Sequence, residues 1–170
     1  MSNYVQGYLE TVDDILRNPL VISMKQYNHH AGISTHFHSV YVSYTVYKYC
    51  ARRNMEKQLT DDITRASLLH DFYLYDWPTE KHEEYHIFYH PKEAVKNIEK
   101  TGIIKLNYMQ KNMILNHMFP AAQMPRSLGG WILTAADKYC ATRELVEGEK
   151  CFRAIYNDID KEIDDAGTVL

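Results

Sequence analysis

The chain has 170 residues, of which 45% are hydrophobic and 24% charged, so it is long enough to fill one hydrophobic core. A formal net charge of -3 provides no broad basic field of the kind that holds a nucleic-acid backbone or an anionic membrane surface. No apolar run approaches the roughly 20 residues that span a bilayer, and the N-terminus lacks the pattern of a signal peptide. We therefore expect one domain over residues 1–170, with its core at about 24–147, in the cytoplasm.

Cysteine, glycine and proline usage narrows the fold class. Cys50, Cys140 and Cys151 form no CxxC pair, which argues against a disulfide framework and against a thiolate zinc site. Only 7 Gly and 5 Pro interrupt the chain, and no segment reads as a strand hairpin. The sequence therefore predicts an all-α protein with long helices.

Two predicted helices come before the helix that carries His38, the first candidate ligand. Apolar residues repeat with helical spacing over 3–17, and Asn18-Pro19 ends that helix and starts another. A loop over 28–32 then breaks the pattern. The next helix begins near Ser34 and holds His38 in its first turn, on an inward face.

A His-Asp pair follows the next predicted helix. The segment Thr60-Asp61-Asp62 marks the acidic start of that helix, and His70 and Asp71 lie at its C-terminal end. An imidazole nitrogen suits first-row transition metals, and a carboxylate binds one ion or bridges two. The pair is therefore a candidate set of metal ligands.

An irregular aromatic stretch over 72–90, which includes Trp77 and His86, follows the pair. A loop of this length in a compact domain often lines or covers a site, although its rings can equally roof the core. His90 and Pro91 mark the start of the next predicted helix.

Two later helices add further candidate ligands. Asn107 and Gln110 form a capping-box pattern at the start of a helix whose last turn carries His117. Ser127 caps the following helix, on which Asp137 faces inwards.

Taken singly, each of these groups has an ordinary explanation, because a histidine on an apolar helix face is more often a satisfied core residue than a ligand. Together they place imidazole and carboxylate groups on the inner faces or at the ends of separate helices. A buried Asp137 also needs a counter-charge, which a metal ion supplies. The residues therefore favour a metal site.

The ordered pattern of H, HD, H, H and D resembles the HD-domain superfamily of metal-dependent phosphohydrolases, specifically its small single-domain bacterial branch. The similarity extends from about Met24 to Glu144. The matching pieces are HSVYVSY at His38, LLHDFYLYDW at His70-Asp71, YHIFYHPKEAV at His90, ILNHMFP at His117 and ADKYCATRE at Asp137. The resemblance implies an HD-domain-like helical bundle with a binuclear metal centre.

The family pattern also implies which residue holds which ion. Carried over one by one, the ligands of the first ion are His38, His70, Asp71 and Asp137, and those of the second are Asp71, His90 and His117, with Asp71 bridging. His86 is the rival of His90, which is favoured because a histidine followed by proline matches the family. Mixed histidine and carboxylate ligands suit Fe, Mn, Co, Ni or Zn better than Mg, and the resemblance favours iron or manganese.

The activity that the resemblance implies is hydrolysis of a phosphoester or phosphoanhydride bond in a small nucleotide-like substrate, by attack of a hydroxide bound to the two ions. Related small HD proteins include symmetrical dinucleoside tetraphosphate hydrolases. Asp71 and Lys138 are the predicted catalytic residues, and Arg126, His86 and Trp77 are the predicted substrate contacts. Lys138 and Arg126 can equally be solvated surface charges.

Two alternatives use the same residues. Some HD-fold proteins that resemble this chain use a mixed-valence di-iron centre to oxygenate small polyols or phosphonates, and ligand identity does not separate them from the hydrolases. In a non-enzymatic interpretation, the ions brace the helical bundle and the aromatic stretch binds a partner. A full ligand set of this kind disfavours the latter, because structural metal sites usually leave no open coordination position.

Overall fold

The computed structural model describes residues 3–29, 32–77, 79–80 and 82–167, with side chains up to residue 163. Within these ranges the chain forms eight α-helices, two 3-10 helices and no β-strand, so the prediction of an all-α protein is confirmed. The elements in chain order are α1 (Asn3–Leu16), α2 (Pro19–Ser23), η1 (Met24–Gln26), α3 (Thr35–Arg52), α4 (Lys57–Leu68), α5 (His86–Thr101), α6 (Tyr108–Asn116), α7 (Leu128–Glu147), η2 (Gly148–Cys151) and α8 (Arg153–Gly167).

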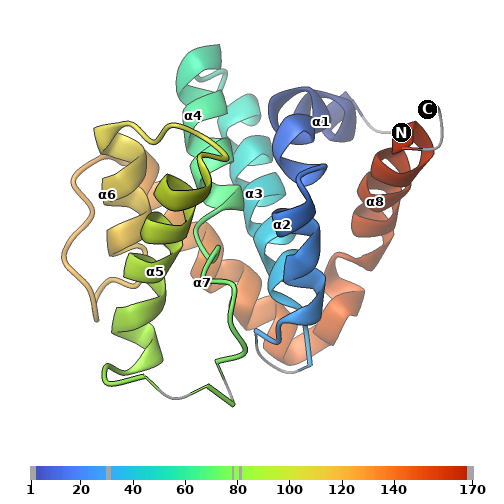
Figure 1. The fold of residues 1–170 in the computed structure, drawn as a ribbon. Helices are drawn as coiled ribbons and strands as arrows, with labels where there is room; N and C mark the ends of the chain where they lie inside the picture. The colour runs from blue at the N-terminus through green and yellow to red at the C-terminus, as the bar shows by residue number, and fades with distance from the viewer. Residues whose placement is uncertain (1–2, 30–31, 78, 81, 168–170) are drawn as a thin grey trace.

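Helix α3 lies at the centre of the fold and packs against both α4 and α7. Figure 1 shows α8 on one side of α3 and the α5–α6 pair on the other. Val40, Val42 and Val46 of α3 have no exposed surface and belong to one hydrophobic cluster that takes in residues from α1 to α8. Burial of these valines keeps α3 in the interior, and any polar side chain on the same helix is carried in with them.

Short-range hydrogen bonds confirm the predicted helix starts at four helices. The side chains of Asn18, Ser34 and Ser127 each accept a hydrogen bond from a backbone N–H of the following turn, at α2, α3 and α7. Asn107 and Gln110 form both bonds of a capping box at α6. These bonds satisfy N–H groups that the helix leaves without partners, and they set which residues of each helix face the core.

The predicted start of α4 is wrong. The helix begins at Lys57, about one turn before the segment Thr60-Asp61-Asp62. Asp61 does not face a free helix N-terminus, because its carboxylate pairs with the ammonium group of Lys57 at 2.6 Å, four residues earlier on the same helix. The C-terminal end of α4 is as predicted, and it still delivers His70 and Asp71 to the interior.

The predicted start of α5 is also wrong. The helix begins at His86 rather than at His90 and Pro91, so the aromatic stretch before it is shorter than predicted. The carbonyl of Tyr85 accepts hydrogen bonds from two N–H groups of the first turn. Pro91 then lies in the second turn, where its missing N–H removes only one helical bond. The sequence pattern of proline at a helix start misplaced the boundary by one turn.

Replacing Ile63 by Ala is expected to lower the free energy of unfolding by about 2–5 kcal/mol, because this side chain of α4 has no exposed surface and lies against Gly129 of α7. Urea denaturation followed by circular dichroism measures the change. Lys57→Ala on the same helix is the control and should change stability by less than about 0.5 kcal/mol, since the Lys57 side chain is 83% exposed. Equal stability of Ile63→Ala and the parent chain would contradict this account of the core.

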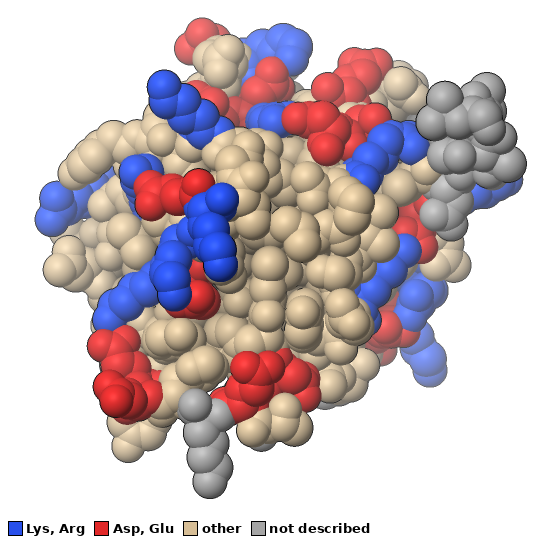
Figure 2. All heavy atoms as spheres, viewed as in Figure 1, with Lys and Arg blue, Asp and Glu red and all other residues tan. Residues whose placement is uncertain are grey.

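Charges of both signs are mixed on the surface. On the face drawn in Figure 2, lysine and arginine side chains lie next to aspartate and glutamate, and no large field of one sign covers it. Ion pairs at the surface of the protein include Lys96 with Glu93 and Lys92 with Glu84. The described helices include none that is long and apolar enough to cross a membrane. Cys50, Cys140 and Cys151 are free thiols, as predicted.

Candidate metal centre

The six predicted metal ligands come together in the interior from five separate segments. They are His38 in the first turn of α3, His70 and Asp71 directly after α4, His90 in α5, His117 directly after α6 and Asp137 in α7. Their exposed fractions range from 0% to 8%. A buried carboxylate or imidazole is costly unless it has a partner, so this concentration of polar groups calls for an explanation beyond packing.

The carboxylate of Asp71 lies in the middle of the cluster. Its Oδ2 faces Nε2 of His70 at 3.5 Å and Nε2 of His38 at 3.9 Å. Its Oδ1 faces Nε2 of His90 at 3.3 Å and Nε2 of His117 at 3.8 Å. Two ligands about 2.1 Å from a common ion lie roughly 3 to 3.5 Å apart. Each oxygen of Asp71 thus lies close to the distance from its own two histidine nitrogens that is expected when all three atoms bind one ion.

Asp137 joins the first of these two groups. Its Oδ1 lies 3.2 Å from Nε2 of His38 and 3.9 Å from Nε2 of His70. The donor atoms of these three residues all lie within 4.8 Å of one another, and so do those of His70, Asp71 and His117. The protein therefore brings buried histidine and aspartate donors within metal-binding distance.

Each of the four histidines among the predicted ligands is oriented by a hydrogen bond from Nδ1, the ring nitrogen that does not face the cluster. Nδ1 of His70, His90 and His117 donates to a backbone carbonyl three or four residues earlier, at 2.6 to 2.8 Å. Nδ1 of His38 donates to Oε2 of Glu144 at 2.8 Å. With the proton on Nδ1 of His70, His90 and His117, the lone pair of Nε2 in each of these rings points into the cluster, and Nε2 of His38 faces the same way. Metal-ligating histidines are held in the same manner.

The contact between His90 and His117 shows why a cation fits. Their Nε2 atoms are 3.0 Å apart, and because both Nδ1 atoms carry the proton, two neutral rings face each other with lone pairs. Burial lowers the pKa of both rings, and neighbouring histidines help to bring that of His117 to about 3, so protonation of either ring is opposed.

Two further buried atoms have unused bonding capacity. Within the part of the chain that the structure describes, Nε2 of His70 and Oδ1 of Asp71 make no hydrogen bond. A buried polar atom without a partner costs roughly 1 to 3 kcal/mol. A bound cation would satisfy these atoms together with the facing nitrogens of His90 and His117, so the donor set fits a metal.

The cluster keeps its aspartates ionised. Burial disfavours the charge on Asp71, but His70, a hydrogen bond from His29 and His90 hold the pKa of its carboxyl well below the usual value. Burial also disfavours the charge on Asp137, and the hydrogen bond with His38 outweighs that cost and lowers its pKa. Ionised carboxylates are the form that binds a cation.

Glu144 is a residue of this cluster that sequence reasoning missed. It is 1% exposed and lies on α7, two turns after Asp137. Burial alone would lower the pKa of His38, but its hydrogen bonds with Asp137 and Glu144 outweigh burial and raise that pKa to about 10. In the metal-free chain a proton on His38 therefore balances these carboxylates, and a bound cation would displace it. The i, i+7 spacing from Asp137 was a usable signal.

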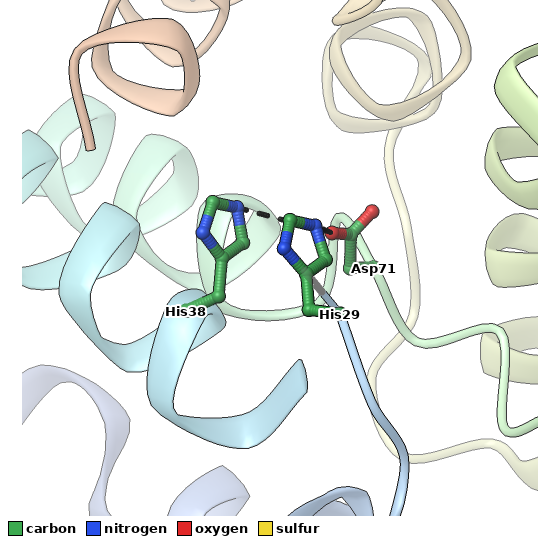
Figure 3. A group of neighbouring side chains, drawn as sticks. All are labelled: His29, His38 and Asp71. Atoms are coloured by element: carbon green, nitrogen blue, oxygen red, sulfur yellow. Dashed lines mark ion pairs between the residues drawn. The ribbon is translucent and has the colours of Figure 1, made fainter. Parts of the chain in front are cut away.

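His29 is the second missed residue. It lies in the predicted loop 28–32, of which residues 30–31 are outside the described ranges. Its Nε2 is 3.0 Å from Oδ2 of Asp71, and Figure 3 shows its ring beside that of His38 with both directed toward this carboxylate. Periodicity contains no signal for His29, because it is not on a helix.

His86 and Trp77 lie next to the cluster without entering it. The ring of His86 stacks with the rings of His90 and Trp77, with centroids 4.6 and 4.9 Å apart, and its Nδ1 is 2.9 Å from the hydroxyl of Tyr75. It is Nε2 of His90 that faces Asp71. Trp77 is 36% exposed, whereas Tyr75 is buried, so the aromatic stretch both roofs the core and borders the site.

The two predicted cations lie in different places. The ammonium group of Lys138 is 3.9 Å from Oδ2 of Asp137 and donates to the carbonyl of His117 at 3.2 Å, so it borders the cluster. Arg126 lines a pocket of about 790 Å³ beside α5 and α6, and none of the six predicted ligands lines that pocket. Its guanidinium contacts the hydroxyl of Tyr108 at 3.3 Å.

The His86→Ala variant is expected to retain the metal content of the parent chain, whereas His90→Ala should lose metal, because of these two rings it is that of His90 that directs Nε2 at Asp71. Elemental analysis of both purified variants measures this difference. If His86 contacts the substrate, KM should rise several-fold in His86→Ala with a smaller change in kcat. Loss of metal from His86→Ala would instead make His86 the ligand.

Comparisons of the chain with protein-family models, with curated proteins and with solved structures each found no match.

Proposed function

We propose that this chain is a metal-dependent phosphohydrolase of the HD-domain type, with two divalent transition-metal ions held by the six predicted ligands. Iron or manganese is the favoured metal, and zinc, cobalt or nickel also suit these donors. The observation that carries the proposal is the position of the Asp71 carboxylate, whose two oxygens face two different pairs of histidines. A carboxylate used in this way is suited to bridging two ions.

Two divalent ions held by these residues would make a bound water more acidic and would neutralise charge on phosphate oxygens. The chain itself supplies the geometry. Asp71 and Asp137 provide negative charge, and the carbonyls and Glu144 that accept from Nδ1 hold the four imidazole rings in the orientation that turns Nε2 toward the cluster. Because these ligands are buried, little reorganisation is needed when ions bind, which favours catalysis through a preorganised site.

The proposed substrate is a small phosphorylated molecule, such as a nucleotide. Lys138 is the cation that borders the ligands, so it is the proposed contact of a phosphate oxygen. His86 and Trp77, which stack on one another, are the proposed contacts of the rest of the substrate. Arg126 lies in the neighbouring pocket and would reach only a longer substrate.

The test is release of inorganic phosphate from a panel of nucleotides, dinucleoside polyphosphates and simple phosphoesters by the chain loaded with Fe²⁺, Mn²⁺, Co²⁺ or Zn²⁺. Metal-dependent turnover of at least one substrate, lost in His90→Ala, is the expected result. Oxygen uptake is recorded in parallel. Uptake of oxygen with a polyol or phosphonate and no phosphate release would point to the di-iron oxygenase instead, and absence of both activities would refute an enzyme of either kind.

A further inference from the structure

His29 lies at the most exposed edge of the histidine–aspartate cluster. Its side chain is 15% exposed, whereas those of the four other histidines are 5% exposed or less. Its Nε2 is nevertheless 3.0 Å from Oδ2 of Asp71, and its ring stacks on that of His38 with centroids 3.9 Å apart. The rings are nearly parallel in Figure 3, so both imidazoles approach the carboxylate from the same side.

We propose that His29 is a seventh metal ligand, which binds the ion held by His38, His70, Asp71 and Asp137. This inference rests on the binuclear centre proposed above. Donor atoms of His29, His38 and Asp71 all lie within 4.8 Å of one another, as in the groups formed by the predicted ligands alone.

The backbone around His29 is fixed by the aromatic stretch. The indole N–H of Trp77 donates to the carbonyl of His29 at 2.5 Å, and the N–H of His29 donates to the carbonyl of Ile33 at 2.8 Å. One residue earlier, the N–H and the side-chain amide of Asn28 both donate to Oδ1 of Asp76 at 3.3 Å. Trp77 is thus a positioning residue for His29, in addition to its proposed contact with substrate.

Seven ligands would divide unequally between the two ions. The first ion would have five protein donors and the second only three, which are Asp71, His90 and His117. Because fewer protein donors would hold the second ion, that ion would be more open to water and phosphate oxygens than the first. The phosphate group is therefore expected on the His90–His117 side, where Lys138 contacts the backbone of His117.

Titration of metal-free protein with Co²⁺ tests the inference without relying on turnover, because the visible absorption of bound Co²⁺ depends on its coordination number. His29→Ala is compared with the parent chain and with His82→Ala. His82 is a matched control, since it stacks on Tyr89 in the same aromatic region and belongs to none of the ligand groups. Affinity for inorganic phosphate is measured on each Co²⁺-loaded protein.

The expected result for His29→Ala is two bound ions, about tenfold or greater weakening of one of them, an altered Co²⁺ spectrum and nearly unchanged phosphate affinity. His82→Ala should match the parent chain. Trp77→Phe, which keeps an aromatic ring but removes the indole donor, should weaken the same ion by a smaller factor.

A parental Co²⁺ affinity and spectrum in His29→Ala would overturn the inference, and so would weakened phosphate binding with both ions unaffected, because His29 would then contact substrate instead. Failure of the proposed hydrolase gives a different pattern, in which both ions bind and respond to His29→Ala but no phosphoester is cleaved. A parent chain that binds no Co²⁺ would overturn both proposals.

Discussion

Asp71→Ala is expected to lose metal and to reduce the proposed phosphohydrolase activity to background. Among the residues whose side chains the structure describes, Asp71 is the one whose two carboxylate oxygens face both histidine pairs. Without it, two cations would face each other with less negative charge between them, so at least one should dissociate. Elemental analysis gives the metal content, and phosphate release gives the activity.

The fold of this variant should survive, because Asp71 follows the end of α4 and contributes little apolar packing. Circular dichroism checks this point. Asp71→Asn keeps the shape of the side chain and should lose metal as well, which separates the effect of charge from that of a cavity. Asp158→Ala, an exposed position on α8, is the control for removal of an aspartate. Two retained ions and full turnover in Asp71→Ala would refute a bridging role.

The positions of the candidate ligands that helices carry were predictable from the sequence, because helical spacing relates each of them to its apolar neighbours. His38 shares the interior of α3 with valines that have no exposed surface. The chain direction at the end of α4 follows from the apolar face of that helix, which places His70 and Asp71 together. In these cases burial of apolar residues determines where the polar side chain lies.

Helical spacing could not decide between His86 and His90 as the candidate ligand. They are four residues apart on α5 and therefore lie on one face, so spacing alone cannot decide which ring reaches Asp71. The decision depends on how α5 packs, and the stack of Trp77 on His86 is part of that packing. A tertiary contact of this kind leaves no periodic signal in the sequence.

His29 was beyond prediction for a related reason. The loop that carries it takes its path from hydrogen bonds to Asp76 and Trp77, which lie 48 residues further along the chain. Glu144 differs, because its spacing from Asp137 on α7 was visible. It was overlooked because a glutamate near the end of a long helix usually faces solvent, and only packing against His38 shows that this one is buried.

Glu144→Leu is expected to weaken metal binding by about 10 to 100-fold although Glu144 is not a proposed ligand. Its Oε2 accepts a hydrogen bond from Nδ1 of His38, which fixes the ring so that Nε2 faces Asp137. Loss of such an outer partner usually costs metal affinity by this factor, because the ligand becomes free to rotate and less basic. Competition with a chelator of known affinity measures the change.

Two further variants separate orientation of His38 from general effects of charge. Glu144→Gln retains an oxygen that can accept from Nδ1 of His38, so its metal affinity should fall less than that of Glu144→Leu. Glu147→Gln removes an exposed carboxylate on the same helix that pairs with Arg143, and it should leave metal affinity unchanged. Equal losses in Glu144→Leu and Glu147→Gln would mean that net charge on α7, rather than the hydrogen bond to His38, controls metal binding. An unchanged affinity in Glu144→Leu would show that His38 needs no outer partner to bind metal.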